Sequence, residues 1–586
     1  MALKRQVVVI KPKGEKAMRS FRKPIRTKKV CHRLTAVFCV PLLALSPLIA
    51  VGDTISVQRG ATLDVSTATT VSAMDVHGML NVQGILATPA EIKVDPKSTA
   101  VSLGTDAGDN AVINIGDYGR IEGGQYNIGG ANGVGRFVIG GKRKDNATSY
   151  GYLKAHLASG QITLSADATS DSGVIDILTL NEGAYAGIKE KNWSGSFQAL
   201  VNRSTQADAR VLFNGGVLVF FSSVGSYVFF SSHSSNATYA DIIPQGEGGK
   251  AIVLEGVNGN PVEIHVAGGT SSSYLTNGTY PIQGKACFRG SGDVILHGPS
   301  TDQPGKWAFS YTSPDVWAQN GDLKLTGTMA MTIRANNCLP RASTNGIVQV
   351  LGNRFCHLDL FGKTNTVNGL VVSGEATLTN SVAGVSQLVL GSVVRDGVFS
   401  VARVGGGPIE MVKRGTGTLT VTNTPSFPVM SVEAGAVLFK DDDCALGSLS
   451  ANDGTSVVVD NSSLVLDAAD ASGANFQVNR GAVLDGSHIS GGLSLSKLTV
   501  DCSSGTGDGA LSGVHFVSSG VIRLENVEAT PIPSLYRLPL VFANSSGLDN
   551  LGAWTVYVNG EDHGRKLAFR DNRLVYYESG LVIIVR

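Results

Sequence analysis

A seven-residue pattern, Val-x-x-Gly-Ala-[Thr/Val]-Leu, recurs at three distant places in this chain of 586 residues. The three copies are VQRGATL from Val57, VEAGAVL from Val432 and VNRGAVL from Val478. We expect the Val to point inward at the end of a short strand and the Gly to turn the chain, because Gly tolerates a positive φ. The final Leu is then expected to point inward again. Looser copies begin at Ile115, Leu180, Phe213 and Val372. Repetition over such distances indicates a repeat architecture rather than several unrelated domains.

Short stretches beside these turns alternate apolar and polar residues with a period of two, which predicts strands that each bury one face. The apolar members are Leu323, Leu325, Met329, Met331, Ile333, Leu419, Val421, Leu493 and Leu495. No long stretch after the N-terminal segment has the apolar stripe of an amphipathic helix. Gly makes up 72 of the 586 residues, well above the usual share of about 7%, and supplies the turns. These features predict an all-β fold.

The fold expected for residues 51–545 is a β-solenoid, in which short strands stack in parallel layers of roughly 20–25 residues around one shared core. Each layer alone cannot bury its inward face, so the layers must stack. Asn and Ser at the turns are expected to form hydrogen-bonded ladders. The competing all-β architecture is a series of sandwiches. Sandwiches would show antiparallel hairpin spacing and linkers, and no linker is evident in the sequence.

The N-terminal segment differs sharply in charge from the rest of the chain. Residues 1–33 hold twelve Lys or Arg and one acidic residue, residues 34–50 carry no charge, and residues 51–586 carry a net charge of −10. A basic segment before a short apolar run is typical of a secretory signal peptide. We therefore predict that residues 1–50 are a basic leader and signal peptide, with an uncleaved N-terminal anchor as the alternative. The acidic body argues against nucleic acid as a partner, because it would repel phosphate.

Residues 409–449 resemble an autotransporter-associated β-strand repeat, whose pattern is roughly K-x-G-x-G-T-L-T-L, a loop, V-x-x-G-x-L and A-L-G. The matching residues are Lys413, Gly415, Gly417, Thr418, Leu419, Val432, Gly435, Leu438, Ala445, Leu446 and Gly447. The resemblance implies a single-stranded right-handed parallel β-helix of the passenger type, exported by a Gram-negative-type bacterium. The C-terminal residues are too few for the membrane β-barrel that ends an autotransporter. We therefore expect any display at the cell surface to use another route.

Residues 546–586 are richer in aromatic residues than the repeats. Their pattern predicts two β-hairpins, the first turning near Asn559-Gly560 and the second in the stretch that starts at Asn572. We expect this segment to be a small C-terminal cap, because an open solenoid end exposes strand edges. A sorting or anchoring segment is the alternative.

No motif in the sequence predicts catalysis, a cofactor or a metal. The five cysteines of the body are widely spaced without C-x-x-C, so we expect isolated buried thiols. Asp441–Asp443 is the densest acidic cluster and is expected to be a solvated turn, with calcium binding as the alternative. His357 and Asp359 would share one face of a strand, as a metal or acid/base pair does, but a surface strand face is the expected role.

The combined prediction is a secreted or surface-associated structural or adhesive protein without catalytic activity, which displays loops on a stiff scaffold. The candidate ligand-binding residues are Trp193, Trp307 and Trp317, and the expected recognition loops are insertions at 141–156, 188–210, 268–290 and 299–320. Expected partners are glycans or components of host or cell surfaces, with association to the cell envelope. One alternative is a β-helical polysaccharide lyase or glycoside hydrolase, although the body lacks N-T-D, G-H-G and R-x-P-x-x-R signatures. Another is a matrix protein that binds nothing specific.

Overall fold

The computed structural model describes residues 54–577, all of which belong to the second of two compact units, residues 49–586. Several short gaps interrupt the description. The gaps of three or more residues are 96–98, 141–154, 166–168, 190–196, 222–226, 233–251, 268–285, 299–304, 310–316, 341–345, 392–395, 504–506 and 528–534.

The structure is 62% strand and 2% helix, which confirms the predicted all-β class. The helix among the described residues is the short 3₁₀ segment η2 (Leu548–Ala553). A membrane-crossing helix, which needs about 20 apolar residues, is absent from the described part of the chain.

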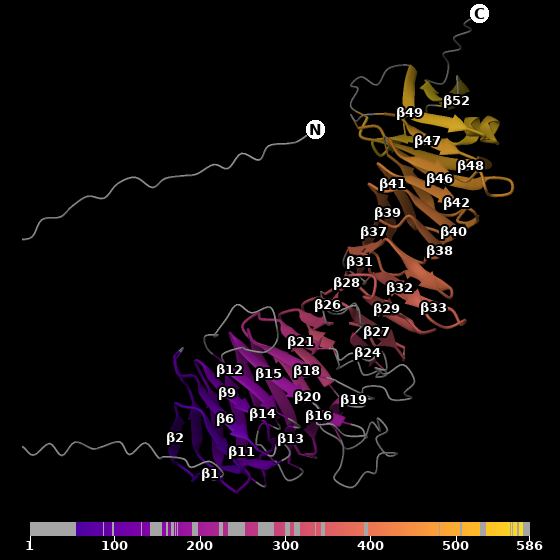
Figure 1. The fold of residues 1–586 in the computed structure, drawn as a ribbon. Helices are drawn as coiled ribbons and strands as arrows, with labels where there is room; N and C mark the ends of the chain where they lie inside the picture. The colour runs from indigo at the N-terminus through magenta and orange to yellow at the C-terminus, as the bar shows by residue number, and fades with distance from the viewer. Residues whose placement is uncertain are drawn as a thin grey trace, which may run out of the picture. The chain divides into compact units, whose positions relative to one another are not determined.

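The N-terminal region, residues 54–267, is drawn in indigo to magenta in Figure 1. Its strands repeat in sets of three. From β1 to β18, each strand pairs in parallel with the third strand that follows it, so β1 (Thr54–Val57) pairs with β4 (Ala73–Val76). A second ladder of strands starts in the same way at β2 (Thr62–Val65), and a third starts at β3 (Thr69–Val71). Three successive strands therefore make one layer, and the next layer repeats them in register.

The C-terminal region, residues 409–558, repeats mainly in sets of two strands. β36 (Ile409–Lys413) pairs in parallel with β38 (Ser426–Val432), and β37 (Thr418–Thr422) pairs in parallel with β39 (Ala436–Lys440). One layer of this region thus needs fewer strands than a layer of the N-terminal region.

One ladder of parallel pairs runs through both regions. It leads from β3 through every layer to β50 (Thr555–Val558) without a missing pair. The sequence-based expectation of parallel stacking is therefore met along the described chain.

The length of a layer varies more than the sequence suggested. Arg414 contacts Glu433 in the next layer, 19 residues later. In the N-terminal region, Arg210 contacts Glu255 on the next strand of its ladder, 45 residues later. The strands keep their register, so the additional residues lie between strands.

The buried apolar side chains form a single contiguous core cluster that includes residues of both regions. All nine alternating residues predicted to face inward are at most 2% exposed. The five described cysteines are buried and are not joined in disulfide bonds, as expected. The expected amide ladder is also present, because Asn214 Nδ2 donates to Asn181 Oδ1 (3.0 Å) and Asn258 Nδ2 donates to Asn214 Oδ1 (3.1 Å).

The prediction that the final Leu of the motif points inward is confirmed for the copy that begins at Val478 and is wrong for the copy that begins at Val432. Leu484 is fully buried, whereas Leu438 is half-buried and its neighbours Val437 and Phe439 face the core instead. A shift of one residue exchanges the two faces of a strand. The residue after the Leu decides the register, because Phe439 gains from burial while the corresponding Asp485 does not.

The first predicted C-terminal hairpin is confirmed. β50 pairs in antiparallel fashion with β51 (Glu561–Asp562), and the turn between them holds Asn559 at φ 47° and Gly560 at φ 85°. Positive φ at both central residues is what a two-residue hairpin turn requires.

The second hairpin differs from the prediction. β53 (Arg573–Tyr577) pairs with the preceding β52 (Lys566–Arg570) rather than with residues that follow it. β53 also pairs in antiparallel fashion with β49 (Leu535–Ala543), which ends the other long ladder of the C-terminal region. Antiparallel strands thus follow the last parallel layer.

Candidate functional site

The candidate ligand-binding tryptophans are only partly within the description. Trp193 lies outside the described residues, as do the side chains of Trp307 and Trp317. The backbone places Trp307 in β24 (Gly305–Phe309) and Trp317 in β25 (Trp317–Gln319), and both strands belong to parallel sheets. Most residues of the four expected recognition loops also lie outside the described residues. The described part of 188–210 includes β16 (Phe197–Asn202) and the start of β17 (Asp208–Asn214), which belong to parallel sheets, so this stretch is not a loop throughout. The binding role of the three tryptophans stays a prediction.

Lys413, the first residue of the repeat motif, is fully buried and links two successive layers. Its Nζ donates hydrogen bonds to the carbonyl oxygens of Arg414 (3.1 Å), Gly415 (2.7 Å) and Ala434 (3.2 Å). Burial lowers the pKa of this ammonium group. The side chain therefore acts as a structural bridge between backbone segments.

The motif glycines allow neighbouring layers to approach each other closely. Gly415 and Gly435 have φ values of 85° and 75°. A Cβ on Gly435 would lie 2.5 Å from the Gly415 oxygen and 2.6 Å from the Gly417 oxygen, and a Cβ on Gly447 would lie 2.6 Å from the Pro428 oxygen. Side chains at these positions would push the layers apart.

Two of the remaining motif residues, Leu419 and Val432, are fully buried in the core. Leu438 faces outward and is half-buried, for the reason given above. None of the eight motif residues belongs to the described hollow or to the His77 cluster presented below.

Asp359 is buried, so its expected place on a surface strand face is wrong. Its side chain is buried because it caps backbone turns of two layers. Oδ1 accepts hydrogen bonds from the N–H groups of Phe361 and Ser381 (3.0 Å each), and Oδ2 accepts one from the Ser381 hydroxyl (2.6 Å).

The acidic cluster Asp441–Asp443 is an exposed turn, as expected. Each carboxylate accepts a hydrogen bond from a different residue of a neighbouring layer. The donors are Asn461 Nδ2 to Asp441 (3.1 Å), the Asn423 N–H to Asp442 (2.7 Å) and the Ser463 N–H to Asp443 (2.9 Å). The three carboxylates thus serve contacts between layers and do not converge on one point.

A hollow of about 750 Å³ lies beside the second ladder near the N-terminal end of the described chain. A row of polar groups lines it, in which Asn81 Nδ2 donates to Asp64 Oδ1 (2.7 Å) and Asn114 Nδ2 donates to Asn81 Oδ1 (2.8 Å). Ile85, which also lines the hollow, is 63% exposed. Polar groups beside an exposed aliphatic side chain can orient a ligand that has both hydroxyl and C–H surfaces.

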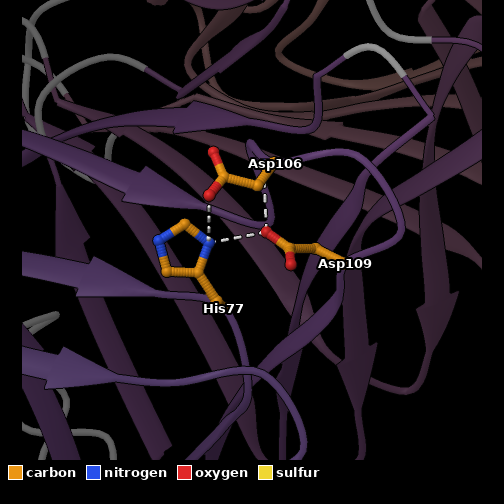
Figure 2. Close-up of side chains that lie close together, drawn as sticks. All are labelled: His77, Asp106 and Asp109. Carbon is orange, nitrogen blue, oxygen red and sulfur yellow. Dashed lines mark hydrogen bonds and ion pairs between the residues drawn. The ribbon is translucent and has the colours of Figure 1, made fainter.

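A second cluster, which the sequence analysis did not single out, contains His77, Asp106 and Asp109 (Figure 2). His77 directly follows β4, and the two acids lie between β7 (Ala100–Leu103) and β8 (Asn110–Ile115). The strand ends Val76 and Leu103 are paired in register, so the segments after them meet at one corner.

The imidazole of His77 has a carboxylate at each ring nitrogen. Nδ1 lies 2.6 Å from Asp109 Oδ2 and 3.7 Å from Asp106 Oδ2, and Nε2 lies 3.1 Å from Asp75 Oδ1. The Asp109 side chain is fully buried, and its Oδ1 accepts a hydrogen bond from Arg59 Nε (2.9 Å). The cluster therefore joins residues from three successive layers.

The hydrogen bonds of the cluster favour a protonated His77 and an ionised Asp109. The hydrogen bond to Asp109 raises the pKa of His77, with a further contribution from Asp75. Burial alone would raise the pKa of Asp109, but hydrogen bonds from His77, the Asp106 N–H and Arg59 outweigh it and lower that pKa. Both ring nitrogens of His77 already face carboxylates, so the pair as it stands offers no open nitrogen for acid/base catalysis.

Sequence reasoning missed this cluster for a specific reason. The residues lie on layers of different length, so their spacing along the chain does not show that they meet. Two sequence features belong to this cluster, namely a His directly after a strand and the Asp-x-x-Asp spacing of Asp106 and Asp109. They indicate a common site only when the register of the strands is known.

No protein-family model matches the chain, and neither curated proteins nor solved structures match it significantly. The similarity to autotransporter-associated repeats therefore depends on the motif residues alone.

Proposed function

We propose that the chain is a non-catalytic structural or adhesive protein, secreted or attached to the cell surface, whose strands form a right-handed parallel β-helix with a C-terminal hairpin cap. The observation that carries this proposal is the ladder of parallel pairs from β3 to β50, in which each layer uses the previous one as a template. Such stacking makes a stiff scaffold that loses little conformational entropy when several weak contacts form at once.

The use of polar side chains supports a scaffold role. Lys413, Asp359 and the Asp441–Asp443 cluster all bind groups of adjacent turns or layers. The polar groups of these side chains therefore stabilise the contacts between layers. The antiparallel strands that follow the last parallel layer fit a cap, because they pair with strand edges that stacking would otherwise leave open.

Export of this scaffold is proposed from the leader. The basic segment followed by an uncharged apolar run has the order of a secretory signal. Fractionation of cells that make the full chain, compared with a variant that lacks residues 1–50, tests this part. Export that does not depend on those residues would contradict it.

The proposed ligands are glycans or other surface components. The contact sites are the three tryptophans and the hollow lined by Asp64, Asn81 and Asn114. The full exported chain is incubated with immobilised acidic and neutral polysaccharides, and both retention on the polysaccharide and release of soluble sugar are measured. Retention without release supports the proposal, whereas steady release of oligosaccharides would show a polysaccharide-cleaving enzyme instead.

Matched variants separate the two contact sites. The triple variant Trp193→Ala, Trp307→Ala and Trp317→Ala tests the tryptophans, and Asn114→Ala tests the hollow. Asn526→Ala is the control, because this exposed amide lies elsewhere on the stack and donates only to Asp501 Oδ1 (2.9 Å). Retention that survives both sets of changes would show that the polysaccharide is bound elsewhere on the stack, whereas no retention of the wild-type chain would leave a scaffold role without adhesion.

A further inference from the structure

The strongest unassigned chemistry in the described residues is the corner at which Arg59, His77 and Asp109 meet. We propose that His77 Nδ1, Asp106 Oδ2 and Asp109 Oδ2 bind one divalent transition-metal ion, with Zn²⁺ as the best match. These three atoms lie within 4.8 Å of one another. One imidazole and two carboxylates form a donor set that Zn²⁺ accepts, with water completing the coordination. Ca²⁺ fits less well, because it prefers oxygen ligands throughout.

The orientation of His77 is already that of a metal ligand. Asp75 Oδ1 lies 3.1 Å from Nε2 and can accept its proton in a hydrogen bond. Without an ion, Nδ1 holds the proton that it donates to Asp109. When an ion displaces that proton, the bond to Asp75 keeps Nε2 protonated, and the Nδ1 lone pair then faces Asp106 and Asp109 (Figure 2). Histidine ligands commonly donate their other ring N–H to a carboxylate in this way.

The distances need only a small adjustment. Ligand atoms about 2.1 Å from a tetrahedral ion lie roughly 3.4 Å apart. The Nδ1 to Oδ2 distances of 2.6 Å for Asp109 and 3.7 Å for Asp106 fall on either side of that value. The ion would take the place of the hydrogen bond between His77 and Asp109. Asp106 is free to follow, because its side chain is 69% exposed.

The net charge of the corner and the hydrogen bond that holds Asp109 in place also suit a divalent ion. Asp75, Asp106 and Asp109 carry three negative charges and Arg59 carries one positive charge, so the corner has a net charge of −2 when His77 is neutral. Arg59 Nε holds the other oxygen of Asp109 (2.9 Å), which keeps this buried ligand in place. Hydrogen-bonded ligating carboxylates are a regular feature of metal sites.

The ion would connect layers of the stack. His77 belongs to one layer, and Asp106 and Asp109 follow β7 in the next. A bound ion would therefore fasten the N-terminal end of the described stack, a role independent of any adhesive or structural function of the whole chain.

The test is calorimetric titration of the full chain with ZnCl₂ after treatment with a chelator, with CaCl₂ as a second titrant. Asp106→Asn removes an exposed ligand with little risk to folding. Asp95→Asn is the matched control, because Asp95 is also exposed and follows a neighbouring strand. We expect Zn²⁺ affinity to fall at least tenfold in Asp106→Asn and to be unchanged in Asp95→Asn.

His77→Gln gives a second readout. Zn²⁺ should raise the thermal unfolding temperature of the wild-type chain and of Asp95→Asn, but not that of His77→Gln or Asp106→Asn. Equal Zn²⁺ affinity in Asp106→Asn and Asp95→Asn, no Zn²⁺ binding by the wild-type chain, or tighter binding of Ca²⁺ than of Zn²⁺ would each overturn the proposal.

Discussion

Ion pairs and closely approaching glycines join layers in both regions of the stack, and a buried lysine adds a third means in the C-terminal region. In the N-terminal region, charged side chains bridge the layers, as Arg210 does with Asp176 (2.6 Å) and Glu255 (3.1 Å). In the C-terminal region, the buried Lys413 bonds to backbone carbonyls and glycines bring the backbones together.

Layer length alone does not separate the two regions. Thr54 pairs with Ala73 in the first layer, and these residues are as far apart in the chain as Arg414 and Glu433. Glycine corners are tight in both regions, since a Cβ on Gly119 would lie 2.0 Å from the Val82 oxygen. The comparison therefore depends on what the buried Lys413 adds to the C-terminal region, and we expect its replacement to cost more than the loss of an ion pair in either region.

Replacement of Lys413 should have the largest effect. Lys413→Met keeps most of the apolar packing but removes three hydrogen bonds to carbonyls, and a buried group without a partner costs about 1–3 kcal/mol. We expect the free energy of local unfolding of β36–β39 to fall by about 4 kcal/mol, as measured by native-state hydrogen exchange.

Lys497→Met is the control in the same region. Lys497 Nζ donates to the Gly473 carbonyl (2.8 Å) and the residue is half-buried, so a smaller loss of about 1 kcal/mol is expected. Equal losses for the two variants would contradict the bridging role of Lys413.

Gly435→Ala should have the second largest effect. The added Cβ would lie 2.5 Å from the Gly415 oxygen and the residue would keep a positive φ, so we expect a loss of about 3 kcal/mol. Gly454→Ala is the control, because its φ is 80° but no atom lies within 4 Å of the added Cβ. Its loss should be about 1 kcal/mol. Thermal and denaturant unfolding of both variants would show whether close approach or φ alone explains the glycine.

Arg210→Met should have a modest effect that sharpens the contrast. Arg210 is 31% exposed and pairs with two acids, so we expect a loss of about 1 kcal/mol in the N-terminal region. The matched change Arg414→Met removes a more exposed pair with Glu433 and should cost less than about 0.5 kcal/mol. A similar loss in Arg210→Lys, which keeps the charge and most of the aliphatic stem, would show that the paired hydrogen bonds of the guanidinium group matter. No loss in either variant would contradict the bridging role of Arg210.

The smallest effect should come from pH. Burial, and then the charge of neighbouring His265, lower the pKa of His297 below its ordinary value of 6.5. The folded state therefore binds this proton less readily than the unfolded state. The contribution of neutral His297 to the free energy of unfolding is complete above pH 6.5. That contribution decreases as the pH falls toward the pKa of His297 in the folded state.

Hydrogen exchange of β23 (Val294–His297) at pH 7.5 and pH 5.5 measures this effect, and His297→Gln should reduce the difference. His488→Gln is the control, because the hydrogen bond to Asp467 raises the pKa of the exposed His488 and its effect has the opposite sign. An unchanged pH difference in His297→Gln would contradict the assignment.

The sequence predicted the parts of the fold that depend on local alternation. Leu323 to Ile333 and Leu419 to Val421 face the core as expected, because alternation in a strand fixes the buried face whenever polar residues occupy the other. It did not predict the register of Leu438, because three apolar residues in a row offer two faces of similar quality.

The candidate sites depended on information that a single sequence does not hold. His77 and Asp109 meet because Val76 and Leu103, the ends of the strands that precede them, are paired in register, and a single sequence does not reveal that register. The repeat residue Lys413 was found through its motif, but its role as a bridge required the positions of carbonyls in the next layer.

The most direct test of parallel, in-register stacking is disulfide crosslinking between neighbouring layers. Thr420 and Leu438 face outward on adjacent strands and are paired in register. In the double variant Thr420→Cys, Leu438→Cys, oxidation should form a crosslink rapidly, because paired Cα atoms lie within disulfide range. Thr420→Cys, Ala436→Cys should form little, because these positions are two residues out of register. Crosslinking of the second pair in preference to the first would contradict the parallel stack.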